Sequence, residues 1–311
     1  MKKSLITFAL LLAVTALNAQ TLIKANFQKG DQATYESVAN IKVSVPMAGN
    51  SESIKTNSQT KITVKDASAD GYVIEMTTTN VKMEGNLEVF QQTGNMLNQY
   101  LSNVPLLLKT DADGKVKDLL NYTEVQTKVS KFAMAFMDSL YKAKPEMEKT
   151  LPKYKMAMSM NSLLTKEAFI ESVEYNTFFQ LFGKTLKTGD KVDMNKQGIK
   201  TTVTYEVNKE PNALNIIGKI KGNMTEDDVK AFLIDKMKQM GADEAMVSQL
   251  DANWGQMQKM GMAKMDVDGT SMTKLLNTGW ATEYSTDMKT KMMGMEMTIN
   301  TVTKLVEHSW K

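Results

Sequence analysis

The segment TDADGKVKDLLN (Thr110–Asn121) nearly returns as MDVDGTSMTKLLN (Met265–Asn277). Each copy places Asp-x-Asp-Gly a few residues before Leu-Leu-Asn. An Asp-Gly pair is typical of a tight turn between antiparallel strands, because glycine reaches the backbone angles that such turns require. We therefore interpret both copies as structural turns. The predicted turn residues are Asp111, Asp113, Gly114, Asp266, Asp268 and Gly269.

Two functional interpretations of Asp-x-Asp-Gly compete with the turn. An EF-hand calcium loop requires an acidic or amide ligand at position five, glycine at six and glutamate at twelve. The first copy has Lys115, Val116 and Tyr122 at these positions, and the second copy departs in the same way. The paired carboxylates have no histidine partner for acid–base chemistry. We therefore predict neither a metal site nor a catalytic site here.

A second repeated motif occurs once before each copy. Lys29-Gly30-Asp31 and Thr188-Gly189-Asp190 both lead into strand-like segments. The spacing from Gly30 to Gly189 differs by only four residues from the spacing between the Asp-x-Asp-Gly copies. Matching marks in the same order indicate an internal duplication. Chance similarity of short polar turns is the alternative.

Apolar and polar residues alternate with period two in several segments, which is typical of half-buried antiparallel strands. Tyr35, Ala39, Ile41, Val43 and Val45 share one face of such a strand. The same pattern appears in residues 200–207 and 213–220, and a last hairpin turns at Gly294.

Amphipathic helical patterns interrupt these strands in three places. Residues 87–101 and 125–140 show helical periodicity, and Thr225 caps a third helical region that extends to about 260. Strand runs with helices inserted at a few points favour an α+β fold over alternating α/β. We predict curved antiparallel β-sheets in two related lobes with inserted amphipathic helices. The expected parts are a signal peptide (1–19), a first β-rich lobe (20–121), a mainly helical connector (122–184) and a second β-rich lobe (185–311) with a helical insertion (225–260) and a C-terminal hairpin.

The first 19 residues read as a secretory signal peptide, because Lys2 and Lys3 precede an apolar run that is too short to span a bilayer. Cleavage after Ala19 is expected, with Ala16 as a second candidate position. Since the chain contains no cysteine, lipoprotein anchoring is excluded. No later stretch is apolar enough for a transmembrane helix. We expect a periplasmic or secreted protein.

Composition excludes several classes of function. The 38 basic residues are all lysines and the net charge is only +3, so nucleic-acid recognition through the arginine fork is not expected. His308 is the single histidine, and thiols are absent. Catalytic triads and zinc sites need more imidazole or thiol than this. We predict no catalytic residue, no cofactor and no enzymatic activity.

The chain contains 26 methionines. Thioethers are soft ligands for Cu(I), so copper binding is one interpretation. The other is that methionine fills irregular core gaps or an adaptable apolar cavity. A curved sheet covered by helices leaves room for an apolar cleft. The apolar residues that would line such a cleft could equally fill a solid core. The candidate cleft residues are Phe132, Phe136, Phe232, Trp254 and Met257.

Three short marks resemble a secreted β-rich domain family of unknown function from Gram-negative bacteria. They are the Lys-Gly-Asp strand start, the Asp-Gly turn, and Thr278-Gly279-Trp280 before the C-terminal hairpin. The resemblance implies export and a two-lobed antiparallel architecture, and it brings no catalytic residues. At the level of fold alone, the layout is also similar to periplasmic lipoprotein carriers, whose open half-barrels hold acyl chains under helices.

The leading functional hypothesis is a non-catalytic envelope protein that binds a lipid-like or other apolar ligand, or another envelope component. One alternative is a hydrolase that acts on glycans with a pair of carboxylates, since the chain has 35 acidic residues. The other is a structural or partner-binding surface protein.

Overall fold

The computed structural model describes residues 20–45, 50–85, 88–146, 148, 152–196, 198–239 and 242–310. The predicted signal peptide, with cleavage at Ala19, lies outside these residues. The strands are β1 (Thr21–Leu22), β2 (Gln32–Val45), β3 (Asn50–Ser68), β4 (Gly71–Gly85), β5 (Leu106–Thr110), β6 (Val116–Leu119), β7 (Thr185–Leu186), β8 (Lys191–Lys196), β9 (Ile199–Lys209), β10 (Ala213–Met224), β11 (Met265–Leu276), β12 (Ala281–Met292) and β13 (Met295–Ser309).

The helices lie between groups of strands, as the periodicity predicts. Thr225 accepts a hydrogen bond from the backbone N–H of Asp228 (3.2 Å), and Asp243 accepts one from Met246 (3.0 Å), so two of them begin at side-chain caps. The helices are α2 (Glu88–Tyr100), α3 (Tyr122–Ala143), α5 (Lys153–Leu163), α6 (Lys166–Asn176), the short 3₁₀ helix η2 (Phe178–Leu181), α7 (Glu226–Gln239) and α8 (Glu244–Lys259).

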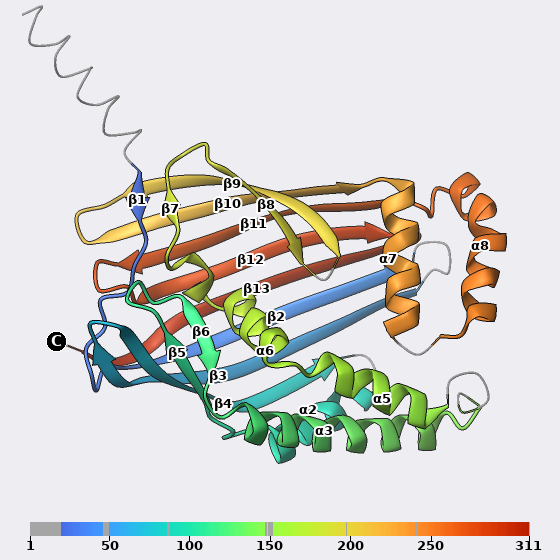
Figure 1. The fold of residues 1–311 in the computed structure, drawn as a ribbon, viewed down its shortest axis with the longest axis horizontal. Helices are drawn as coiled ribbons and strands as arrows, with labels where there is room; N and C mark the ends of the chain where they lie inside the picture. Colours follow the sequence, from blue (N-terminus) through green and yellow to red (C-terminus); the bar gives the residue numbers. More distant parts are fainter. Residues whose placement is uncertain are drawn as a thin grey trace, which may run out of the picture.

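One antiparallel sheet of eleven strands forms the body of the protein, in the order β6-β5-β4-β3-β2-β13-β12-β11-β10-β9-β8 (Figure 1). Consecutive strands are neighbours within each half of the chain. The two halves meet where β2 pairs with β13. The predicted antiparallel α+β class is therefore confirmed, but the strands of the expected lobes join in a single sheet.

The two faces of the sheet differ in polarity, as the period-two alternation predicts. On the front face, which carries α6 and η2, Tyr35, Ile62 and Ile74 are buried. On the back face, the alternate residues are mostly lysines, acids, amides and threonines. Cross-strand ion pairs such as Lys289–Glu296 (2.7 Å) and Lys304–Glu283 (3.8 Å) lie on this face. The back face is therefore a solvated surface.

The first hydrophobic core fills one end of the front face. The rings of Phe178 and Phe179 stack with centroids 4.9 Å apart, and Phe182 packs edge-on against both. Trp280, which has no exposed surface, lies between Phe27 (4.4 Å) and Trp310 (5.0 Å). The region predicted as a mainly helical connector therefore supplies the centre of the core through η2.

A second, smaller core lies under α7 and α8 at the other end of the sheet (Figure 1). Its buried members include Val229 of α7, Trp254 of α8 and Met265 of β11. Gly198, in the turn before β9, approaches the ring of Phe232 so closely that an added Cβ would lie 2.9 Å from it. The helices α7 and α8 thus pack directly on the sheet.

Candidate functional site

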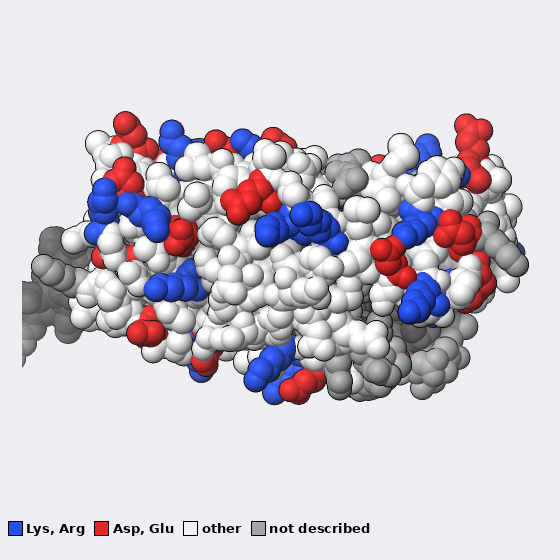
Figure 2. Space-filling model, turned by 90° about the horizontal axis from the view of Figure 1, so that it is seen from below, with Lys and Arg blue, Asp and Glu red and all other residues white. Residues whose placement is uncertain are grey.

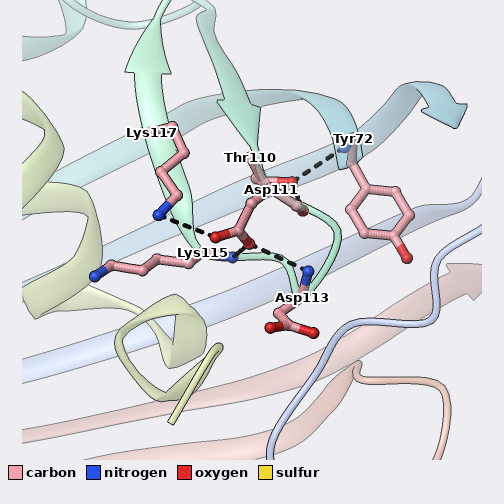
Figure 3. A network of polar contacts seen from close by, with 6 residues as sticks. All are labelled: Tyr72, Thr110, Asp111, Asp113, Lys115 and Lys117. Atoms are coloured by element: carbon pink, nitrogen blue, oxygen red, sulfur yellow. Dashed lines mark hydrogen bonds and ion pairs between the residues drawn. The ribbon is translucent and has the colours of Figure 1, made fainter. Parts of the chain in front are cut away.

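The first Asp-x-Asp-Gly forms a tight turn between β5 and β6 (Figure 3). The Asp111 carboxylate accepts hydrogen bonds from the backbone N–H groups of Asp113 (3.1 Å) and Lys115 (2.9 Å). Its other oxygen pairs with the Lys117 ammonium at 3.0 Å. Burial alone would raise the pKa of Asp111, but the Lys117 ammonium and these N–H donors outweigh it and lower the pKa.

This turn is also packed against the first core. Gly114 has φ +94°, and a Cβ at this position would lie 2.6 Å from the Cβ of Ala25 and 3.1 Å from the Phe182 ring. The carbonyl of Asp113 accepts a hydrogen bond from Ala25 N–H at 2.8 Å. Because Asp111 already bonds to the turn and to Lys117, its carboxylate has a structural role and does not fit a calcium ligand set.

The prediction of a turn at the second copy is wrong. Asp266, Asp268 and Gly269 lie inside β11, which pairs with β10 and β12 along this stretch. A Cβ on Gly269 would lie 2.6 Å from the carbonyl oxygen of Asp287, so this glycine permits close strand packing. The two aspartates point to the solvated back face, where Asp266 accepts a hydrogen bond from the Asn223 amide at 3.1 Å.

The five predicted cleft residues lie in two separate groups. Phe232, Trp254 and Met257 belong to the second core, and Trp254 is only 6% exposed. Phe132 and Phe136 stack on α3 with centroids 6.3 Å apart and belong to neither core. The part of the prediction that involves Trp254 therefore describes a packed core and not an open cleft.

An apolar surface that the alternation pattern did not reveal lies on the front face of β13, β2 and β3. We call it the apolar strip. Ile299, Ile41 and Ile54 form one cross-strand row, and Met297 and Val43 form the next. All five side chains are partly exposed, and neither core cluster includes them.

Glu52 of β3 ends the second row of the strip, beside Val43. Its Oε2 atom is buried and has no hydrogen-bond partner. The alternation of apolar residues indicated that Ile41 and Val43 share one face of β2. It also indicated that Met297 and Ile299 share one face of β13. It could not indicate that these two strands pair, so the strip could not be predicted.

The back face carries a hollow of about 500 Å³ over β13, β2, β3 and β4. Lys42, Lys55 and Glu84 contribute its charged groups, together with amide and hydroxyl side chains. Figure 2 shows a different side of the molecule, seen from below, where lysines and acidic residues are interspersed around a broad area without charged side chains. Mixed charges of this kind create no strong field of one sign.

The structure also bears on metal binding and on membrane crossing. Among the described residues, no group of three or more His, Asp or Glu side chains is arranged to hold a metal ion. The described helices include none with both the length and the apolarity that a bilayer crossing requires. The methionine clusters are dispersed: Met265 is buried in the second core, whereas Met158 on α5 is 70% exposed.

Comparison with known proteins gives no family. No family model matches the chain, and no curated protein matches it.

Several solved structures are similar at low levels. A lipovitellin structure, described by its lipid–protein interactions, has a TM-score of 0.46 and 10% identity, and the match covers 91% of this chain and 26% of that one. DynF of the dynemicin biosynthesis pathway of Micromonospora chersina has a TM-score of 0.19 and 6% identity, covering 95% and 88%. A porin-like protein from Bacteroides uniformis has a TM-score of 0.16 and 10% identity, covering 91% and 99%. This chain thus spans about a quarter of the lipovitellin chain, and these likenesses assign no function.

Proposed function

We propose that this protein is an exported, non-catalytic binding protein that holds an apolar or amphiphilic ligand on the apolar strip. The observation that carries the proposal is that five aliphatic or thioether side chains on one sheet face remain partly exposed outside both cores. Apolar side chains that adjoin one another on one face and remain partly exposed support an interaction surface. The solvated back face of the same strands shows that this apolarity is confined to one side.

The energetics of binding favour a ligand with a long apolar part or with a polar group beside a shorter one. Association costs about 4 kcal/mol or more in lost translational and rotational freedom. At roughly 25 cal/mol per Å², a ligand must cover about 160 Å² of apolar surface to offset this cost. A stable complex needs either a longer apolar contact or a polar anchor at the edge of the strip.

The carboxyl groups support the non-catalytic part of the proposal. A general acid at neutral pH needs a raised pKa. The carboxyls of Asp118, Asp228 and Glu296 have lowered pKa values instead, because Lys166, Lys200 and Lys289 respectively hydrogen-bond to them. The pKa of the Asp111 carboxyl is lowered as well. These four groups are therefore poor candidates for the general acid of a glycan hydrolase.

Native mass spectrometry tests the proposal on protein purified from its own cell envelope. Excess mass that organic solvent removes is the expected result. A protein mass without any adduct would overturn the proposal. A co-purifying polypeptide without small-molecule adduct would also overturn it, in favour of a partner-binding surface protein.

A matched pair of variants tests the position of the ligand. Ile299→Glu places a charge on the strip, whereas Val302→Glu places the same charge on the opposite face of the same strand, beside Val38. We expect the adduct to be lost in the first variant and kept in the second, with both proteins folded by circular dichroism. Equal retention of the adduct in both variants would exclude the strip as the site.

A further inference from the structure

The three most exposed of the large apolar side chains in the described part of the chain lie on two neighbouring helices. They are Met134 of α3, which is 59% exposed, and Tyr154 and Met158 of α5, which are 63% and 70% exposed. The other exposed apolar side chains of this size lie elsewhere in the fold, and none of them is more than 50% exposed. Single exposed apolar residues are common, but a group of them indicates an interaction surface.

The helices α3 and α5 pack side by side at one corner of the molecule (Figure 1). The Lys153 ammonium of α5 pairs with the Asp138 carboxylate of α3. Met134 lies one helical turn before Asp138 on the same side of α3, and Tyr154 directly follows Lys153. Met158 lies one turn after Tyr154 on the same side of α5. The three exposed side chains are therefore grouped around this ion pair, and we call them the helix-pair surface.

The segment that carries the helix-pair surface is rich in lysine. Residues 122–163 contain seven lysines and four acidic residues and so have a net charge of +3, which equals the net charge of the whole chain. Lys131 lies one turn from Met134, and Lys153 and Lys155 flank Tyr154. The excess of lysine is modest, so charge alone does not create a strong attraction. The four acidic residues of the segment are Glu124, Asp138, Glu146 and Glu148.

We propose that the helix-pair surface binds an anionic phospholipid bilayer, with Met134, Tyr154 and Met158 inserted among the headgroups and the nearby lysines against the lipid phosphates. Helices with lysines around exposed apolar and aromatic side chains bind membrane surfaces in this way. A bilayer accepts an apolar side chain at any point below its charged surface, so separate side chains among lysines suit it. A protein partner needs a matching pocket for each anchor. This inference goes beyond the proposed function and does not rest on it.

Sedimentation with vesicles tests the inference on the mature protein. The vesicles contain phosphatidylcholine either alone or mixed with phosphatidylglycerol. We expect binding to be about fivefold tighter or more when phosphatidylglycerol is present, since each lysine near an anionic surface contributes about this factor. The affinity for the anionic vesicles should fall as salt is added.

A matched pair of double variants tests the apolar contribution. Met134→Ser with Met158→Ser changes the helix-pair surface, whereas Met260→Ser with Met295→Ser changes two exposed methionines at the end of α8 and the start of β13. We expect the first variant to bind anionic vesicles about tenfold more weakly and the second to stay within about twofold of wild type. Circular dichroism checks that both variants are folded.

A second matched pair tests the lysines. Lys131→Gln with Lys155→Gln removes two charges from α3 and α5, and Lys209→Gln with Lys221→Gln removes two from β9 and β10. The first variant should lose about tenfold in affinity for the anionic vesicles, and the second should stay within about twofold. Equal losses would show that net charge drives binding, which overturns the inference.

Three other results would also overturn the inference. They are no binding to either kind of vesicle, equal binding to both kinds, and equal losses in the two methionine variants. Soluble poly-glutamate, added in place of vesicles, examines the rival occupant. If the protein binds poly-glutamate and no vesicle, the surface takes an acidic polypeptide and the inference is wrong. None of these results changes the adduct expected on the apolar strip, so the proposed function is judged separately.

Discussion

Asp31 and Asp190 make the same contact in two turns that lie far apart in the chain. The Asp31 carboxylate accepts a hydrogen bond from Gln28 N–H, and the Asp190 carboxylate accepts one from Lys187 N–H, both at 2.9 Å. The preceding glycine has φ +92° in each turn. One turn leads into β2 and the other into β8, the first sheet strand of each half. The repeated Lys/Thr-Gly-Asp motif therefore forms the same turn in both halves of the chain.

Removing either carboxylate should destabilise the protein, by unequal amounts. Asp31 is only 8% exposed, whereas Asp190 is partly exposed, so Asp31→Ala removes the more buried of the two carboxylates. We expect a loss of about 2 kcal/mol for Asp31→Ala and about 1 kcal/mol for Asp190→Ala in urea unfolding. Asp31→Asn, which keeps an acceptor oxygen, should lose less than Asp31→Ala. A larger loss at Asp190 would contradict this account.

Gly114→Ala and Gly30→Ala form a matched pair, since both glycines have positive φ near +90°. At Gly30 an added Cβ meets nothing within 4 Å, so only the backbone penalty of about 1–2 kcal/mol applies. At Gly114 the Cβ collides with Ala25, which adds about 1–3 kcal/mol of overpacking. The expected order of midpoints in urea is wild type, then Gly30→Ala, then Gly114→Ala. Equal midpoints for the two variants would show that the Ala25 contact is unimportant.

Gly269→Ala should be destabilising although its backbone is extended. The new Cβ would lie 2.6 Å from the carbonyl oxygen of Asp287, which forces β11 and β12 apart at a cost of about 1–3 kcal/mol. Gly255→Ala on α8 is the control, because nothing lies within 4 Å of its Cβ. It should stabilise by up to about 1 kcal/mol. Thermal unfolding of both variants checks the prediction, which fails if Gly269→Ala is as stable as wild type.

Tyr284 should make the protein sensitive to alkaline pH. Burial raises the pKa of its phenol from 10.0 to about 12, partly opposed by a hydrogen bond with Thr303. Above pH 10 the unfolded chain loses this proton while the folded protein keeps it, so stability falls as pH rises from 10 to about 12. The expected loss is about 3 kcal/mol, at 1.4 kcal/mol per unit of pKa.

Denaturant unfolding at several alkaline pH values checks this expectation against Tyr284→Phe. The variant should show a shallower decline between pH 10 and 12, since it has no phenol to ionise. Lysine deprotonation affects both proteins equally, so the difference between the two curves reports Tyr284 together with its coulombic effect on the pKa of Tyr35. Identical curves would show that Tyr284 titrates normally in the folded protein.

Local patterns predicted many of the longer elements. Alternation identified β2, β9, β10 and the hairpin of β12 and β13, and helical periodicity identified α2, α3, α7 and α8. These signals depend on neighbouring residues in the chain, which is why they can be read directly from it. The boundaries of the predicted domains, the internal duplication and export stay predictions.

Long-range pairing could not be predicted in the same way. Whether Asp266–Gly269 is a turn or a strand depends on β10 and β12, which flank it in space, and not on the Asp-Gly pair itself. The aromatic centre at Phe178, Phe179 and Phe182 was also missed, although the cluster of three phenylalanines within five residues was a usable signal. The apolar strip and Glu52 become visible only once β2 is known to lie between β3 and β13.

The pairing of β2 with β13 has a consequence for the order of assembly. Ser37 and Thr303, whose hydroxyls lie 2.8 Å apart across this pair, are separated by 266 positions in the chain. Each half can build its own meander from local hairpins, but the sheet stays divided until β13 docks on β2. Before that event two long strand edges are open, and open edges recruit other chains. We therefore expect the chain to aggregate most readily before β13 pairs with β2, and we expect this pairing to be slow because it joins residues far apart in the sequence.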